Sequence, residues 1–143
     1  MLKRITLALI VLSGLLFGAK RPGAVFLMIW PGSRPTALGG AFTAISDDAS
    51  AAYYNPAGLG FQDAINLSMM HVNWLPGLYP DMYYEYLAVS APFEKIGTFA
   101  FNGVYLTTGE TDVYNSDQQL IGTYTTFDFN LGLAYGREIN EKF

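Results

Sequence analysis

The chain contains no cysteine and only one histidine, and charged residues make up 14% of its 143 residues. Without cysteine there can be no disulfide framework of the kind that stabilises small secreted domains, and no cysteine-linked lipid anchor. A zinc site built from histidine and cysteine is excluded as well, since His71 would be its only such ligand. Ordinary soluble domains have about 25% charged residues, so the low charge is the first unusual property of this sequence.

The first nineteen residues lack a polar face. Lys3 and Arg4 precede an apolar run at residues 5–17, and the small residues Gly18 and Ala19 follow it. A basic start, an apolar stretch and small residues at its end are typical of a secretory signal peptide. The run is shorter than the roughly 20 residues that a transmembrane helix needs. We predict a signal peptide at residues 1–19, with cleavage after either Gly18 or Ala19.

Positive charge is scarce once the signal is removed. Two of the eight basic side chains, Lys3 and Arg4, belong to the signal, which leaves six against twelve acidic ones. Nucleic-acid binding requires a basic face, because the phosphate backbone dominates affinity. We therefore expect no nucleic-acid partner.

Long apolar runs are also missing after the signal, although hydrophobic residues make up 51% of the chain and aromatic residues 15%. Such a composition in an exported chain is typical of the bacterial outer membrane, where strands alternate apolar and polar side chains around a closed barrel. It predicts an all-β protein, specifically an antiparallel transmembrane β-barrel. A soluble secreted β-sandwich, whose strands also alternate, is the alternative.

Alternation is clearest at residues 123–137. Every second position there is apolar, with an aromatic ring at each end: Phe127, Phe129, Leu131, Leu133 and Tyr135. The positions between them are small or polar. Since successive side chains of a strand point to opposite faces, one face of this strand is expected to be wholly apolar.

Three further stretches alternate in a similar way, at residues 64–72, 82–93 and 96–108. A short turn at residues 92–95 and a longer polar connection at 109–119 are expected between strands, as in outer-membrane barrels.

Four strands within residues 63–143 are too few for a closed barrel, because the smallest single-chain examples have about eight. We expect this chain to be the N-terminal part of a larger barrel. Pooling of strands between several copies is the alternative.

The segment at residues 20–62 does not alternate and precedes the strands. Ser46 and Asp47 are favourable helix N-caps, and Asp48 suits the positive end of a helix. We predict a short helical or irregular plug inside the barrel lumen, and a cap that only closes the lower mouth is the alternative. The residues assigned to the plug and lumen are Asp47, Asp48, Tyr53, Tyr54, Asn55, Pro56 and Gly58.

Several motifs follow one another in a specific order in this part of the chain. They are SRPTALGGAFTA at residues 33–44, DDASA at 47–51, YNPAGL at 54–59 and YEYLA at 84–88. In order and spacing these motifs resemble the N-terminal part of the PorV/PorQ family of outer-membrane proteins, over about residues 25–109. That family resembles the FadL-type transporters of long-chain fatty acids, which share the Asn-Pro-Ala-Gly element. One departure is that Tyr53-Tyr54 stands where the family commonly has an aromatic pair ending in tryptophan.

The resemblance implies a FadL-like barrel of about fourteen strands. Some members handle substrate proteins as part of the type IX secretion system, whereas FadL-like relatives pass hydrophobic small molecules. Both branches share these motifs, so the resemblance leaves the choice open.

No residue pattern indicates catalysis. A Ser-His-Asp arrangement could use only His71, and Asp47-Asp48 could bind calcium but also suit a helix cap. Gly39-Gly40 is not followed by the lysine of a phosphate-binding loop. We expect no enzyme activity, no cofactor and no metal.

Aromatic side chains at strand ends are expected at the membrane interface, namely Trp74, Tyr83 and Tyr135. The sequence thus predicts a non-catalytic bacterial outer-membrane barrel protein of the PorV/PorQ type, associated with transport or type IX secretion. Its expected partners are outer-membrane lipid and either secretion-system proteins or a hydrophobic small molecule. A soluble secreted binding module and a FadL-like transporter of hydrophobic compounds are the alternatives.

Overall fold

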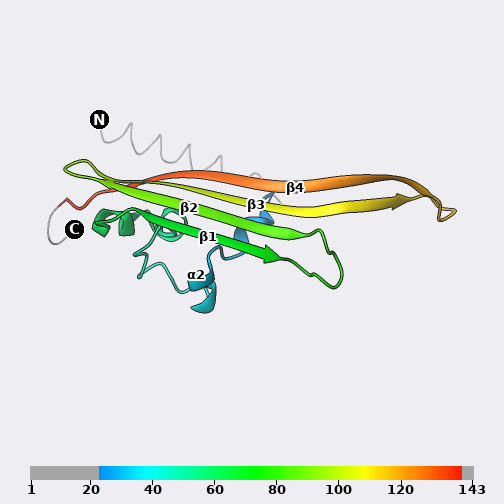
Figure 1. Ribbon diagram of the computed structural model, residues 1–143, viewed down its shortest axis with the longest axis horizontal. Helices are drawn as coiled ribbons and strands as arrows, with labels where there is room; N and C mark the ends of the chain where they lie inside the picture. The colour runs from blue at the N-terminus through cyan, green and yellow to red at the C-terminus, as the bar shows by residue number, and fades with distance from the viewer. Residues whose placement is uncertain (1–22, 140–143) are drawn as a thin grey trace, which may run out of the picture.

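The computed structural model describes residues 23–139, and the predicted signal peptide lies outside them. Four strands form one antiparallel sheet in chain order (Figure 1). They are β1 (Asn66–Asn73), β2 (Tyr83–Phe93), β3 (Gly97–Tyr114) and β4 (Leu120–Gly136). The expectation of an all-β architecture built from antiparallel strands is confirmed at this level.

The chain ahead of the sheet forms four short helical turns along one face of the sheet (Figure 1). They are η1 (Val25–Met28), α2 (Ser33–Ala37), α3 (Ala51–Tyr54) and η2 (Pro56–Phe61). Within residues 23–139, no helix has both the length and the apolar character needed to cross a membrane. We call residues 23–62 the N-terminal segment.

The helix caps predicted in this segment are placed differently. The residue before α3 is Ser50, which makes no side-chain capping bond. The Ser46 hydroxyl instead donates to carbonyls of the preceding turn, and Asp47 binds Arg34. Asp48 starts the α3 turn, because its Oδ1 accepts a hydrogen bond from the Ser50 amide at 2.7 Å. The prediction of caps at Ser46 and Asp47 was therefore wrong, since both side chains have other partners.

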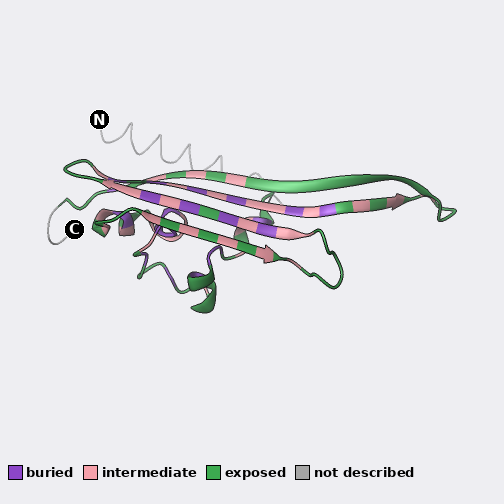
Figure 2. Cartoon of the chain, viewed as in Figure 1, coloured by how far each residue is buried: buried purple, intermediate pink, exposed green. Residues whose placement is uncertain are grey.

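The two faces of the sheet carry different side chains because alternate strand residues point in opposite directions. In β2, Tyr84, Tyr86, Ala88 and Ser90 are buried, while the residues between them are more exposed (Figure 2). We call the face with the buried side chains, which packs against the N-terminal segment, the inner face, and the opposite one the outer face. The alternation predicted for residues 82–93 is therefore confirmed in β2.

Strands β3 and β4 are longer than predicted. The first half of the polar stretch expected to be a loop continues β3 as far as Tyr114, and β4 begins at Leu120, so the connection itself is only residues 115–119. Beyond Thr107, β3 has no partner in β2 and pairs with β4 alone. A bulge between Thr107 and Glu110 marks this point, and Gly109 there has a φ of 68°, which glycine adopts without strain. We call residues 108–126 the β3–β4 ribbon; it projects past the other two strands in Figure 1.

The core lies between the inner face and the N-terminal segment. One cluster packs Phe26 and Ala49 of the segment against the strands at Tyr84, Tyr86, Ala88 and Val104. A second cluster packs Ala51, Ala52 and Leu59 against Ala100, with Ala134 beside it. Small residues occupy the inner face where α3 and η2 approach it, and large tyrosines occupy it where the chain lies further away.

Gly136 at the end of β4 permits the closest of these approaches. A Cβ atom there would lie 2.6 Å from the Pro56 carbonyl oxygen and 2.7 Å from the Leu59 Cβ. We expect Gly136→Ala to lower the free energy of unfolding by about 1–3 kcal/mol, because rigid backbone has to shift. Thermal unfolding followed by circular dichroism measures the effect.

The matched control for this change is Gly122→Ala in the same strand, where a Cβ atom would meet nothing within 4 Å. Equal unfolding midpoints for the two variants would contradict the proposed close packing of η2 on β4.

Candidate functional site

The first element of the candidate site is the stretch at residues 24–31, which we call the strap. It contains one turn of 3-10 helix and then runs extended at Ile29. Three tyrosine hydroxyls donate to alternate strap carbonyls: Tyr53 to Leu27 at 2.5 Å, Tyr84 to Ile29 at 3.4 Å and Tyr54 to Pro31 at 2.8 Å. These bonds satisfy strap carbonyls that no helix or sheet pairs.

Aromatic packing fixes the tyrosines that hold the strap. The rings of Tyr53 and Tyr54 meet edge to face with centroids 5.1 Å apart, and Phe42 meets Tyr54 at 5.4 Å. Tyr53 also meets Tyr86 of β2 at 6.4 Å. Edge-to-face pairs of this kind stabilise beyond their buried area. Among the described residues, the Tyr86 hydroxyl is buried without a hydrogen-bond partner.

Burial disfavours ionisation of the two tyrosines of α3. It raises the pKa of Tyr53 above the usual value, and burial together with neighbouring Tyr53 and Tyr86 raises the pKa of Tyr54 further. Both phenols therefore remain hydrogen-bond donors at alkaline pH values where an exposed tyrosine ionises. The predicted plug residues Tyr53 and Tyr54 thus act as structural donors to the strap in this arrangement.

Asp47 and Asp48 converge on one guanidinium. Arg34 of α2 contacts both carboxylate oxygens of Asp47, at 2.5 and 3.1 Å, and one oxygen of Asp48 at 3.3 Å. The hydrogen bond from Arg34 lowers the pKa of Asp47, and it raises the pKa of Arg34 itself. The Arg34–Asp47 pair is about half exposed, so it orients the turn more than it stabilises the fold.

Asn55, Pro56 and Gly58 make a sharp reversal between α3 and η2. The Asn55 side chain donates to the Thr43 carbonyl at 2.9 Å and accepts the Ala57 amide at 3.2 Å. Pro56 opens η2, a position where its missing N–H costs nothing. At Gly58 a Cβ atom would lie only 2.1 Å from the Ser46 carbonyl oxygen, so the close contact requires glycine.

Gln62 is a residue that the sequence reasoning missed. Its amide nitrogen donates to the Asp48 carbonyl at 2.7 Å, and its amide oxygen accepts from Ser90 at 2.5 Å and Asn66 at 3.2 Å. It therefore ties the N-terminal segment to β1 and β2. No local pattern around Gln62 signals this role, because all its partners are distant in the sequence or on another element.

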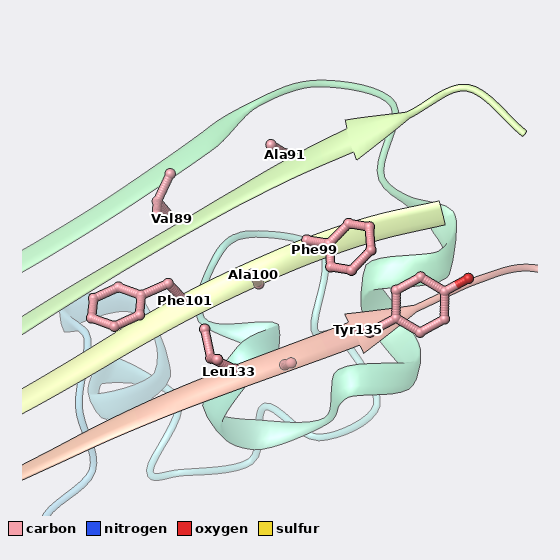
Figure 3. A pocket seen from close by; sticks show the side chains of 8 residues that line it. Val89, Ala91, Phe99, Ala100, Phe101, Leu133 and Tyr135 are labelled. Carbon is pink, nitrogen blue, oxygen red and sulfur yellow. The ribbon is translucent and has the colours of Figure 1, made fainter. Parts of the chain in front are cut away.

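The second element of the site is the outer face, which is mostly apolar and which no element within residues 23–139 covers. Between β2, β3 and β4 it is hollowed into a shallow groove of about 490 Å³ (Figure 3). Side chains that project into the groove include Val89, Phe99, Phe101, Leu133 and Tyr135. A neighbouring groove of about 530 Å³ is lined by Met69, Leu87, Phe129 and Leu131, among others.

Aromatic rings gather at both ends of this outer face. At the end near the short β2–β3 turn, Phe99 lies 5.9 Å from Phe93 and 5.0 Å from Tyr135, measured between ring centroids. At the opposite end a row of rings runs across the strands: Tyr83 to Tyr105 at 6.1 Å, Tyr105 to Phe127 at 5.9 Å and Phe127 to Phe129 at 6.4 Å. We call these the lower and upper aromatic clusters.

Of the three expected interface aromatics, Tyr83 and Tyr135 lie in these outer clusters but Trp74 does not. Trp74 packs against Tyr84 in the inner-face core, with ring centroids 6.2 Å apart. The expectation for Trp74 therefore differs from the structure. Trp74 lies two residues beyond Val72, which also packs in this core. Because every second strand residue points to the same face, Trp74 points to the inner face as Val72 does.

The candidates that the sequence offers for catalysis or metal binding are His71 and the pair Asp47 and Asp48. His71 binds Glu85 through Nδ1 at 2.8 Å and Asn73 through Nε2 at 3.1 Å, on the outer face. Within residues 23–139, no three carboxylate or imidazole side chains gather closely enough to hold a metal ion.

A family model described as an uncharacterised protein family, UPF0164, matches residues 18–131. The match covers most of the sequence, so the chain belongs to this family. No curated protein and no solved structure matched the chain. The family description names neither PorV/PorQ nor FadL, and that resemblance stays a prediction.

Removing the two hydroxyls of α3 is expected to loosen the strap. We expect Tyr53→Phe/Tyr54→Phe to lower the free energy of unfolding by about 1 kcal/mol per bond, because two strap carbonyls lose their donors. Chemical denaturation measures the change, and limited proteolysis should cut the strap faster. Tyr124→Phe, at an exposed position of the β3–β4 ribbon, is the control.

The same variant tests the raised pKa values. Above about pH 10 the unfolded chain releases its phenolic protons, while the folded chain retains those of Tyr53 and Tyr54. Stability should therefore fall as the pH rises above about 10, and the double variant should lose less than the wild type. Parallel pH profiles would show that these phenols are not perturbed by folding.

Proposed function

We propose that this member of the UPF0164 family is a bacterial outer-membrane β-barrel protein whose four described strands form part of the barrel wall. The N-terminal segment occupies the lumen side as a plug. The protein acts without catalysis in transport or secretion across the outer membrane, in the manner of the PorV/PorQ family that its motifs resemble. Its lipid-facing surface is the outer face of the sheet.

The observation that carries the proposal is the composition of the outer face between the two aromatic clusters. Two complete register rows there contain only apolar side chains or glycine: Leu67, Val89, Phe101 and Leu133, and then Met69, Leu87, Gly103 and Leu131. Leu133 is 88% exposed and Leu131 is 64% exposed. Monomeric soluble proteins rarely expose contiguous apolar patches of this extent, whereas membrane barrels present an apolar band flanked by aromatic girdles.

The inner face supports the same proposal by contrast. It carries small and polar residues, including Ser90, Ala100, Asn102 and Asp128, and it is the side against which the N-terminal segment packs. In a soluble sandwich the face turned away from the core is polar. Here the covered side is the more polar one, which is the arrangement of a barrel whose lumen is filled.

The sheet edges are consistent with continuation into a wall. Among the described residues, β1 pairs only with β2 and β4 pairs only with β3, so each leaves one edge without a partner. Exposed edges of this length tend to pair with further strands, and closure of a barrel removes them. In the proposed barrel, further strands pair with both edges.

The plug supplies the mechanism of the proposed transport. The tyrosines that hold the strap, together with the Asn55–Pro56 reversal, keep the N-terminal segment against the wall, where cargo or ligand has to pass. Passage is passive and depends on displacement of this segment. The cargo would be a protein if the chain acts like the secretion-associated members of the PorV/PorQ family, and a hydrophobic small molecule if it acts like the FadL-type transporters.

Charge placed on the outer face distinguishes a membrane wall from a soluble sheet. We expect Leu131→Arg to destabilise the membrane-inserted protein by about 2–4 kcal/mol, the usual cost at the middle of a lipid-facing band. Denaturant titration of the full-length protein in lipid vesicles measures the difference. In a soluble sandwich the same exposed position would accept arginine at almost no cost, so an unchanged stability would contradict the proposal.

The matched control is Asp128→Arg, three residues away in the same strand and on the inner face. It should leave membrane insertion intact, because lumen-facing positions tolerate charge. Heat-modifiable gel mobility, which reports a folded barrel, verifies insertion of both variants.

Deleting residues 37–58 from the full-length protein should open the pore. The deletion removes α3 and the chain on both sides of it, including all of the predicted plug residues. We expect the ion conductance of the variant in planar bilayers to rise well above that of the wild type. A variant that folds, as judged by heat-modifiable mobility, but conducts like the wild type would contradict the plug.

A further inference from the structure

One register row on the outer face changes character from one side of the sheet to the other. His71 on β1 lies opposite Glu85 on β2, Glu85 lies opposite Tyr105 on β3, and Tyr105 lies opposite Phe129 on β4. The row therefore begins with a hydrogen-bonded imidazole–carboxyl pair and ends with aromatic rings. A membrane surface that ran along the register rows would give all four side chains the same environment.

The His71–Glu85 pair does not suit a hydrocarbon environment, because both side chains are polar and ionisable. The side chains of His71 and Glu85 are 56% and 43% exposed, and the Nδ1–Oε1 distance is 2.8 Å. Asn73 adds a polar contact to the Nε2 atom of His71. Moving even a paired charge from water into lipid has a desolvation penalty that its mutual attraction often fails to offset. Phe129 in the same row has the opposite preference.

We infer that the bilayer surface crosses the outer face obliquely, from between Met69 and His71 on β1 to between Phe127 and Thr125 on β4. This inference rests on the proposed membrane insertion and adds the line along which lipid headgroups meet the wall. The row beyond Phe127 supports it, because Glu110 lies opposite Thr125 there and the side chains become polar. The His71–Glu85 pair then lies at the headgroup level, on the aqueous side of the line.

The slope of this line gives the tilt of the strands. Met69 is in the same register row as Leu131, and Phe127 lies four residues further along β4. Four residues at about 3.3 Å each advance the boundary by about 13 Å, while the three spacings from β1 to β4 at about 4.8 Å each span about 14 Å. The strands therefore cross the bilayer at about 40° to its normal, within the range of outer-membrane barrels, about 35–45°.

The lower aromatic cluster steps in the same sense. Phe93 on β2 pairs with Gly97, whereas Tyr135 on β4 lies opposite Phe99, two residues along β3. On β2 the apolar band thus ends at Phe93, and on β4 it ends at Tyr135. The end on β2 lies one outer-face position further from the upper aromatic cluster than the end on β4. Both ends of the apolar band shift in one direction across the sheet, as they do when tilted strands cross a layer of constant thickness.

Because residues 1–143 contain no cysteine, a cysteine introduced here is the only one in this part of the protein, and any cysteine elsewhere in the full-length protein is replaced by serine first. Single cysteines are introduced into the full-length protein at outer-face positions, and the protein is reconstituted into phospholipid vesicles. The decisive pair is Asn73→Cys and Phe127→Cys, because register places the two residues in the same row at opposite sides of the sheet. A charged, membrane-impermeant maleimide reports exposure to water.

We expect Asn73→Cys and Thr125→Cys to react quickly. Met69→Cys and Phe127→Cys should react at least about tenfold more slowly, because the charged reagent does not enter hydrocarbon. Equal rates for Asn73→Cys and Phe127→Cys would overturn the oblique boundary and leave membrane insertion intact. Fast reaction at Met69→Cys and Leu131→Cys, equal to that of Asp128→Cys on the inner face, would overturn the proposed function itself.

Discussion

The packing of the N-terminal segment on the inner face is the interaction on which the rest of the structure depends. Backbone approaches the sheet closely at Gly136 and Ala100, so large side chains are excluded there, and Tyr84 and Tyr86 fill the space where the strap lies further away. Because strand residues alternate, every inner position that is small or hydroxyl-bearing is followed by a position on the other side. The large apolar residues of β2, β3 and β4 are therefore concentrated on the outer face, where no described element covers them.

The N-terminal segment is ordered largely by hydrogen bonds to its carbonyl groups. Its helical turns are at most six residues long, so most of its backbone has no partner within a helix. Tyrosine hydroxyls and the Gln62 amide donate to those carbonyls from α3, β2 and the end of the segment. Buried backbone groups must find partners, and side-chain donors let an irregular chain lie against a sheet without forming a strand. The same arrangement allows the proposed plug to separate from the wall, since few of its hydrogen bonds belong to the backbone pairing of the β-sheet.

The features that could be predicted from the sequence are those with a local signal. The period of two in β2 and β4 assigns side chains to faces without knowledge of partners, and the turn after Phe93 has a proline and charged residues beside it. The continuation of β3 beyond Thr108 was missed because residues 109–112 are glycine or polar and therefore show no alternation. Asp47 was misplaced because a cap is a local preference, whereas its partner Arg34 is thirteen residues away. The tyrosine contacts to the strap join parts of the chain up to 55 residues apart, so no local pattern could indicate them.

Tilt alone does not account for the length of the β3–β4 ribbon. Under the proposed oblique boundary, β4 must extend two outer-face positions further than β1 to cross the same bilayer, which brings it to Phe127. The strand nevertheless continues to Leu120, and β3 continues to Tyr114 beside it. This additional length carries Glu110, Asp112 and Asp117 and contains no basic residue, so it has no cationic side chain to form an ion pair with phosphate groups. An isolated two-stranded ribbon is only marginally stable in water, and neighbouring strands of a closed wall would supply the missing pairing. The ribbon therefore connects the two proposals: a sheet that spans the bilayer obliquely, and a wall that continues beyond the edge of β4.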